Sequence, residues 1–131
     1  MWKFTPILKH TLWGGSKIAK LKGMVGKGES IGESWEISSL AGSVSVVADG
    51  VDAGLSILQL IARDKESLLG RRNYERYGDE VPLLVKFIDA EKDLSIQVHP
   101  NDAMALMHGH RGKTEMWYVL DAADGTRICN G

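Results

Sequence analysis

The sequence has a single cysteine, Cys129, among 131 residues. One thiol excludes a disulfide within the chain and a zinc site built from several cysteines. The scarcity of cysteine, together with an N-terminus that lacks the apolar stretch of a secretory signal, predicts a cytoplasmic protein in a reducing compartment. The longest apolar runs, such as SILQLIA at residues 56–62, are too short to cross a bilayer.

The sequence also lacks an excess of charge of either sign. Sixteen Lys and Arg residues against 17 Asp and Glu residues give a formal net charge of -1. Such a chain has no overall basic field to hold nucleic acid or an anionic membrane, so we expect neither partner, and an anionic ligand would have to be small and recognised locally. Three prolines and 15 glycines predict many tight turns. The length suits one domain, residues 1–131.

The hydrophobic pattern predicts a mainly β, antiparallel domain with helical additions. Helices are expected over residues 56–69, ending at Gly70, and over residues 101–108, where Asp102 most simply caps the helix. Residues 16–32 are expected to form a short helical turn and an irregular loop, and residues 71–80 a polar surface loop. Strands are expected over residues 3–8, 34–39, 43–48, 83–88, 94–99 and 115–120, with a return strand from Thr126.

Two of these predicted strands carry polar side chains on one face. Because alternate residues of a strand share a face, one face of residues 94–99 carries Ser95, Gln97 and His99. By the same rule, Lys113 and Glu115 share a face of the later strand. An imidazole, an amide oxygen and a carboxylate form a donor set that suits Zn²⁺, Mn²⁺ or Fe²⁺. A solvated polar face is the commoner origin of such a pattern, and the residues alone leave both interpretations open.

Longer stretches around these residues resemble a known family. The run PLLVKFIDAEKDLSIQVHPND (82–102), followed by GKTEMWYVL (112–120), closely resembles the type I mannose-6-phosphate isomerases of the cupin superfamily. LWGG (12–15), GESWEIS (32–38) and LLG (68–70) fall where that family has similar sequences, so the resemblance covers essentially the whole chain. It implies a cupin or jelly-roll-type antiparallel β-sandwich with short helices. It also implies interconversion of mannose 6-phosphate, a small sugar phosphate, and fructose 6-phosphate.

The resemblance implies one Zn²⁺ per chain, with Gln97, His99 and Glu115 as metal ligands. The family's fourth ligand is a histidine far downstream, and it uses an arginine later still. The chain therefore resembles only the N-terminal portion of the family and is expected to be either a fragment or a naturally short protein. Taken alone, it is expected to have weak or no isomerase activity. A non-catalytic, truncated cupin-like sugar-binding or regulatory module is the alternative hypothesis.

Four further side chains receive functional predictions. Lys113 is predicted to be catalytic by resemblance, contacting phosphate or assisting proton transfer, with a solvated lysine as the alternative. Lys86 lies in an apolar strand, where a lysine must reach solvent, form an ion pair or face a cavity, and we predict a catalytic role for it too. Ser95 and Trp13 are predicted to contact substrate, although either side chain could be purely structural.

Two expectations concern the surface of the chain. Glu33 and Glu36, which flank a tryptophan, are expected to be exposed carboxylates. An unpaired sheet edge near residues 126–130 is expected to favour a homo-oligomer, because open edges invite association.

Overall fold

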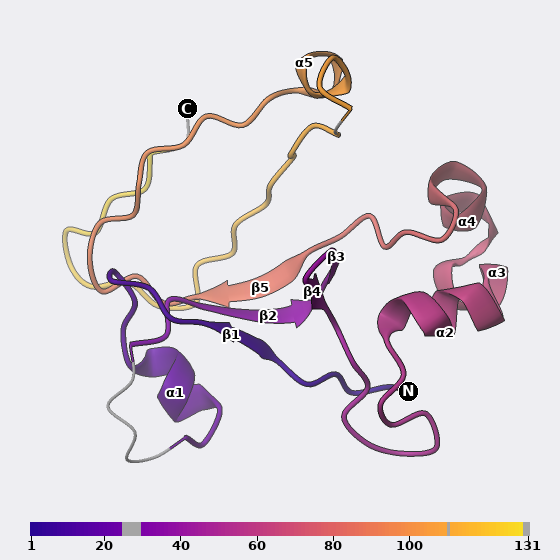
Figure 1. Cartoon of the computed structure of the whole chain (residues 1–131). Coiled ribbons are helices and arrows are strands. Elements are labelled where there is room, and N and C mark those ends of the chain that lie inside the picture. Colours follow the sequence, from indigo (N-terminus) through magenta and orange to yellow (C-terminus); the bar gives the residue numbers. More distant parts are fainter. Residues whose placement is uncertain (25–29, 110, 130–131) are drawn as a thin grey trace. The chain divides into compact units, whose positions relative to one another are not determined.

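The computed structural model describes residues 1–24, 30–109 and 111–129 (Figure 1). The chain divides into two compact units, Met1–Leu94 and Ser95–Gly131, which are described separately below. The single domain expected over residues 1–131 stays a prediction. Part of the loop expected at residues 16–32 falls on residues 25–29, which lie outside the described residues.

A three-stranded antiparallel sheet forms the centre of the first unit. It consists of β1 (Ile7–Lys9), β2 (Glu33–Ile37) and β5 (Val85–Ile88), with β2 in the middle (Figure 1). Glu33 pairs with Ile88, and a bulge between Trp35 and Ile37 shifts the register of β2 against β5. Expected strands at residues 34–39 and 83–88 are therefore confirmed, with bounds one or two residues different.

A two-stranded hairpin follows the central strand. It pairs β3 (Ser39–Leu40) with β4 (Ser43–Val44), and the buried Ser38 and Ser45 hold its base. The amide of Ser38 donates to Oγ of Ser45 at 2.9 Å, and the amide of Ser45 donates to the carbonyl of Ser38 at 2.8 Å. The strand expected over residues 43–48 is thus present but shorter, because Val46 and Val47 make only isolated bridges, to Ser56 and Phe4.

Three glycines and one buried aspartate join the ends of the sheet to α1 (Lys17–Leu21). A Cβ on Gly14 would lie 2.4 Å from the backbone nitrogen of Gly32, and a Cβ on Gly15 would lie 2.8 Å from both carboxylate oxygens of Asp89. Only 8% of Asp89 is exposed, and its Oδ2 accepts from the amide of Lys17 at 2.6 Å. This carboxylate satisfies amides that start α1, a stabilising position for a negative charge.

Three helices follow in the first unit: α2 (Ile57–Asp64), α3 (Glu66–Leu69) and α4 (Arg71–Tyr77). Ser56 and Gln59 form a capping box at the start of α2, and Ile57, Leu60 and Ile61 are its buried residues. The single helix expected over residues 56–69 is broken at Lys65, whose φ of 45° is unfavourable for a residue with a side chain. Gly70, with φ 78°, ends α3 as the sequence predicted.

The polar loop expected at residues 71–80 is wrong, because most of it forms α4. Arg71 and Glu75 pair across one turn at 2.9 Å, and the side-chain amide of Asn73 donates to the carbonyl of Leu69 at 3.0 Å. Polar residues with good helix propensity can form an exposed helix without an apolar stripe. Among the described residues, none of the helices has the length and apolar character that a membrane span requires.

The second unit has one helix and extended segments without strand pairing. The helix is α5 (Asp102–Leu106), capped by Asn101, whose side chain accepts from the amide of Met104 at 2.9 Å. The expectation that Asp102 caps it is therefore off by one residue. Strands expected at residues 94–99 and 115–120 are wrong for this structure, because a strand needs a ladder partner and these segments have none among the described residues.

The end of the second unit also differs from expectation. A turn at Asp124-Gly125 is present, with Gly125 at φ 79° and the amide of Thr126 bonded to the carbonyl of Ala123 at 3.1 Å. The return strand expected from Thr126 is wrong for the described residues, because residues 126–129 form no strand. Asn130 lies outside the described residues. The homo-oligomer expected from an edge here stays a prediction.

We expect Gly14→Ala to lower the free energy of unfolding by about 2–4 kcal/mol, because the new Cβ meets backbone atoms that cannot rotate away. Gly42→Ala is the comparison variant. Gly42 has φ 77° and open space around it, so only the backbone strain of about 1 kcal/mol is expected there. Urea denaturation of both variants measures the difference. Equal losses would show that the close approach at Gly14 contributes nothing.

Candidate functional site

Three charged or ionisable side chains meet in the second unit. The Lys113 ammonium lies 3.0 Å from Oε1 of Glu115 and 3.2 Å from Nε2 of His99. Nε2 of His99 lies 3.5 Å from Oε2 of Glu115. The structure therefore brings together two of the three predicted metal ligands and one predicted catalytic lysine, although residues 94–99 and 115–120 are not paired as strands. We refer to His99, Lys113 and Glu115 as the polar triad.

Two hydrogen bonds to backbone amides hold the two segments of the polar triad together, and we refer to these two bonds as the backbone clamp. Oδ1 of Asp102 accepts from the amide of Gly112 at 3.0 Å, and the amide of Lys113 donates to the carbonyl of Pro100 at 3.2 Å. A Cβ on Gly112 would lie 2.6 Å from the amide nitrogen of Asp102. The start of α5 therefore packs directly on Gly112, and this contact places His99 beside the chain that carries Lys113 and Glu115.

The charges of the polar triad influence one another. Partial burial raises the pKa of Glu115, but the hydrogen bond and charge of Lys113, the charge of His99 and a hydrogen bond from Trp117 together lower it more. The net result is that the pKa of Glu115 lies below its usual value. Glu115 is therefore a carboxylate at neutral pH, which is the form that accepts hydrogen bonds or binds a cation.

The remaining predicted residues of the second unit form a separate pair. The side-chain amide of Gln97 donates to Oγ of Ser95 at 2.9 Å. This bond leaves the amide oxygen, the atom that would bind a metal, for another partner. Gln97 as a ligand and Ser95 as a substrate contact stay predictions.

The spacing within the polar triad fits a shared metal ion. Two ligand atoms bound to a tetrahedral zinc at roughly 2.0–2.1 Å lie about 3.4 Å apart, and the separation of the His99 and Glu115 atoms is 3.5 Å. One imidazole nitrogen and one carboxylate oxygen are also donors that Zn²⁺ accepts. The described residues contain no group of three or more His, Cys, Asp and Glu side chains placed for a metal, so a third protein ligand would have to be of another type, such as Gln97.

Lys86 lies in the first unit, on β5, and forms an ion pair. Its Nζ lies 2.7 Å from Oε1 of Glu33, whose Oε2 accepts from the indole N–H of Trp35 at 2.7 Å. The ammonium of Lys9 lies 4.6 Å from the centre of the Trp35 ring. Of the three fates expected for Lys86, the ion pair is the one observed; its catalytic role stays a prediction.

The expectation that Glu33 and Glu36 are exposed carboxylates is wrong. Their side chains are only 16% and 25% exposed. Glu36 pairs with Lys22 at 2.8 Å and also accepts from Oγ of Ser34 at 2.6 Å. Each carboxylate is partly buried against a lysine from another segment of the chain, Glu33 against Lys86 and Glu36 against Lys22. The apolar position of Lys86 was the one sequence signal that pointed to a buried acidic partner.

Trp13 is half-buried in the first unit, and its ring lies beside Gly32. A Cβ on Gly32 would lie 2.8 Å from its six-membered ring, and its carbonyl accepts from the amide of Glu91 at 2.9 Å. These contacts fit the structural alternative that the sequence left open. Substrate contact by Trp13 stays a prediction.

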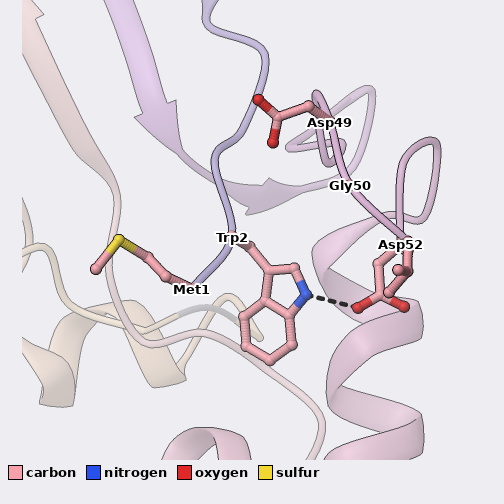
Figure 2. A pocket seen from close by; sticks show the side chains of 6 residues that line it. Met1, Trp2, Asp49, Gly50 and Asp52 are labelled. Carbon is pink, nitrogen blue, oxygen red and sulfur yellow. Dashed lines mark hydrogen bonds between the residues drawn. The ribbon is translucent and has the colours of Figure 1, made fainter.

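A hollow of about 290 Å³ lies at the N-terminus of the first unit, and neither predicted site residue of that unit, Lys86 or Trp13, lines it. It is lined by Met1, Trp2, Asp49, Gly50, Val51 and Asp52 (Figure 2). The indole N–H of Trp2 donates to Asp52 at 2.7 Å, and Arg63 donates to the same carboxylate at 2.6 Å. These polar groups bind one another, so we interpret the hollow as part of the attachment of the N-terminus to α2.

The comparisons identify the family. Residues 1–123 match the family described as phosphomannose isomerase type I, catalytic domain. The chain is 37% identical over 130 residues to the mannose-6-phosphate isomerase ManA of Bacillus subtilis, covering 98% of this chain and 39% of that protein. It is 42% identical over 121 residues to the mannose-6-phosphate isomerase of Streptococcus mutans, covering 92% and 37%.

Similar solved structures point to the same family. A mannose 6-phosphate isomerase from Bacillus subtilis superposes with a TM-score of 0.78 at 34% identity, over 94% of this chain and 38% of that one. A variant of phosphomannose isomerase from Salmonella typhimurium superposes with a TM-score of 0.69 at 28% identity, over 82% and 27%. The fold is thus mainly β, antiparallel and cupin-type with short helices, as expected. The chain belongs to the type I phosphomannose isomerase family, and it spans 37–39% of the length of the two curated relatives named above.

Replacing Asp52 tests the attachment of the N-terminus. Hydrogen bonds from Arg63 and then Trp2 lower the pKa of Asp52 from 3.8 to about 2. A carboxylate with a lowered pKa stabilises the fold at pH values above its unfolded pKa, and this stabilisation disappears as the pH falls through the folded pKa. We expect the stability difference between the native chain and Asp52→Asn to shrink between about pH 5 and pH 2.

Thermal unfolding across this pH range is the measurement. Arg63→Met is the matched variant, because it removes the first cause of the lowered pKa and should reduce the same pH dependence. A stability difference for Asp52→Asn that does not change with pH would contradict the interpretation.

Replacing Asp102 tests the backbone clamp. We expect Asp102→Ala to raise the hydrogen-exchange rate of the Gly112 amide by about 5- to 10-fold, because that amide loses an acceptor whose bond contributes about 1 kcal/mol. Asp102→Asn keeps a side-chain oxygen and should have a smaller effect. The amide of Lys17, bonded to Asp89, serves as the internal control. Unchanged exchange at Gly112 would mean that the clamp does not hold this segment.

Proposed function

We propose that the protein to which this sequence belongs is a metal-dependent aldose–ketose isomerase that interconverts mannose 6-phosphate and fructose 6-phosphate. The observation that carries this proposal is the polar triad, which lies within the residues that match the isomerase family. The curated relatives bear the name mannose-6-phosphate isomerase. Because the chain spans 37–39% of their length, the activity and the substrate are both proposals for this protein.

The proposed metal ion is Zn²⁺, held by His99, Glu115 and Gln97. The support is the separation of 3.5 Å between the His99 and Glu115 atoms and the preference of zinc for nitrogen and oxygen donors of this kind. When bound, such an ion would supply a Lewis acid that polarises the sugar oxygens. The lowered pKa of Glu115 favours this assignment, since a metal ligand must be deprotonated.

Lysine side chains supply the remaining chemistry that the reaction needs. The isomerisation moves a proton between adjacent carbons, and it requires a base, stabilisation of negative charge on oxygen and a hold on the phosphate. Lys113 already donates to a carboxylate and an imidazole, so its ammonium is oriented within the polar triad. We propose that Lys113 and Lys86 are catalytic and that Ser95 and Trp13 contact the sugar phosphate.

The proposal extends to the setting of the enzyme. We propose that it acts in the cytoplasm, where sugar phosphates and reduced cysteines are both found, in keeping with its single cysteine. The balanced net charge of -1 favours a small anionic substrate over nucleic acid or a membrane surface.

His99→Ala tests the proposed function. Loss of an imidazole ligand should lower zinc content at least tenfold, and isomerase activity by about 100-fold or more, since even changes outside the ligand set cost about 10- to 100-fold. The fold should survive, because His99 is partly exposed and its loss leaves the backbone clamp intact. Zinc stoichiometry, melting temperature and conversion of mannose 6-phosphate are measured together, on the 131-residue chain and on any longer protein that contains it.

His10→Ala is the matched control, because His10 lies in the first unit and its Nδ1 contacts the carbonyl of Ser30 at 3.1 Å. It should leave zinc content unchanged. Normal zinc content with a lowered melting temperature in His99→Ala would contradict the ligand assignment. Binding of the sugar phosphate without conversion, in a longer protein with its zinc bound, would favour the non-catalytic sugar-binding module.

A further inference from the structure

The Lys113 ammonium contacts the same two side chains, His99 and Glu115, that would bind the proposed metal ion. It lies 3.2 Å from Nε2 of His99 and 3.0 Å from Oε1 of Glu115, and it therefore bridges the imidazole and the carboxylate. An ammonium group carries only donors, so this contact is a hydrogen bond in the form of His99 that is neutral with Nε2 unprotonated, which is also the form that can bind a metal through Nε2. The lone pair that would bind a metal is the lone pair that now accepts from Lys113.

The two partners differ in how many sites they can offer. A carboxylate has two oxygens and several lone pairs, so Glu115 can bind Lys113 through Oε1 and still present Oε2, which faces His99 at 3.5 Å. A neutral imidazole has one acceptor lone pair. At His99, the ammonium and a metal ion are therefore mutually exclusive.

We propose that Lys113 is an internal cation that holds the metal-free site together and competes with the metal for His99. This inference rests on the proposed metal site and adds a role for Lys113 before any metal or substrate binds. In the metal-free protein, the ammonium balances the charge of Glu115 and keeps the imidazole turned toward it. A metal ion enters only when Lys113 gives up Nε2, and the energy of that contact is subtracted from the metal affinity.

The backbone clamp explains why Lys113 competes with the metal more than it organises the ligands. Asp102 holds the amide of Gly112, and Pro100 holds the amide of Lys113, independently of the lysine side chain. Loss of the ammonium therefore leaves His99 and Glu115 on segments that are still tied together. The site keeps its ligands and loses only its competitor.

The size of the effect follows from the contacts. Hydrogen bonds to charged groups are among the stronger ones, but the Lys113 side chain is 45% exposed, so solvent weakens its hold on the site. We expect Lys113→Met to bind Zn²⁺ about tenfold more tightly than the native chain, because the fraction of molecules with a free ligand lone pair rises.

Isothermal titration of the 131-residue chain with Zn²⁺ is the test. Lys113→Gln is a second variant that also removes the ammonium, so the result does not depend on how well methionine is tolerated. Lys22→Met is the matched control, because Lys22 forms an ion pair of 2.8 Å with Glu36 in the first unit and its loss changes the net charge equally. The control should bind Zn²⁺ as the native chain does.

Salt separates displacement from simple repulsion between Lys113 and the metal. Repulsion through solvent is largely screened in about 1 M sodium nitrate, where the Debye length is about 3 Å. The contacts from Lys113 to His99 and Glu115 are short, so salt weakens them without abolishing them. The ratio between Lys113→Met and the native chain should therefore fall at high salt but stay above one, and equal binding by the two at high salt would overturn the proposal.

The outcomes distinguish this inference from the proposed function. Equal or weaker Zn²⁺ binding by both Lys113 variants, with measurable binding by the native chain, overturns the role of Lys113 and leaves the metal site standing. No binding by any form overturns both. Nitrogen-15 NMR of the ammonium groups adds a direct readout: addition of Zn²⁺ should shift the Lys113 signal and leave that of Lys22 unchanged, and an unshifted Lys113 signal in a zinc-bound chain contradicts displacement.

Discussion

A buried carboxylate at the start of α1 organises the first unit of the chain. Oδ2 of Asp89 accepts from the amides of Lys17 and Ile18 at 2.6 and 3.3 Å, while the side chain of Ser16, the N-cap residue, makes no capping hydrogen bond. The carboxylate reaches those amides because Gly15 has no side chain in the way. Burial of this charge is tolerated because amide donors and the helix dipole replace the water that it loses.

The backbone of Asp89 also sets the register of the sheet that carries Lys86. The amide of Asp89 donates to the carbonyl of Gly32 at 2.9 Å, directly after β5 and directly before β2. That bond continues the register in which Glu33 pairs with Ile88, and it brings the Glu33 carboxylate within reach of Lys86. An ion pair 53 residues apart in sequence thus depends on a close approach of glycine backbones.

In the second unit, ionic contacts and hydrogen bonds to loop amides bring the site residues together, whereas pairing of two strands was expected to do so. The sequence predicted His99 and Glu115 on the polar faces of two strands, but the structure joins them through α5, Gly112 and the Lys113 ammonium, without a ladder among the described residues. The alternation of polar and apolar side chains was informative about which side chains share a side. It could not report whether a backbone partner is present, because hydrogen bonding of a strand depends on a second segment.

Prediction from sequence succeeded where the signal was local. The alternation around Trp35, the apolar run before Asp89 and the helix stop at Gly70 all lie within a few residues of the elements they specify. It failed for α4, because an exposed polar helix has no apolar stripe to reveal it. It also failed for Glu33 and Glu36, because a carboxylate with a distant lysine looks the same in sequence as a solvated one.

The sequence by itself determined the family, the antiparallel β-rich class and the residue types of the candidate site, since each depends on short motifs and on side-chain periodicity. Only the tertiary structure decided that Asp89 starts α1, that Glu33 pairs with Lys86, and that one ammonium bridges His99 and Glu115. The contacts of Asp89 with Lys17, of Glu33 with Lys86 and of His99 with Lys113 join residues 72, 53 and 14 positions apart, and the first two lie beside glycines where the chain approaches itself closely. Distances of that kind are properties of packed atoms in three dimensions, and no one-dimensional pattern contains them.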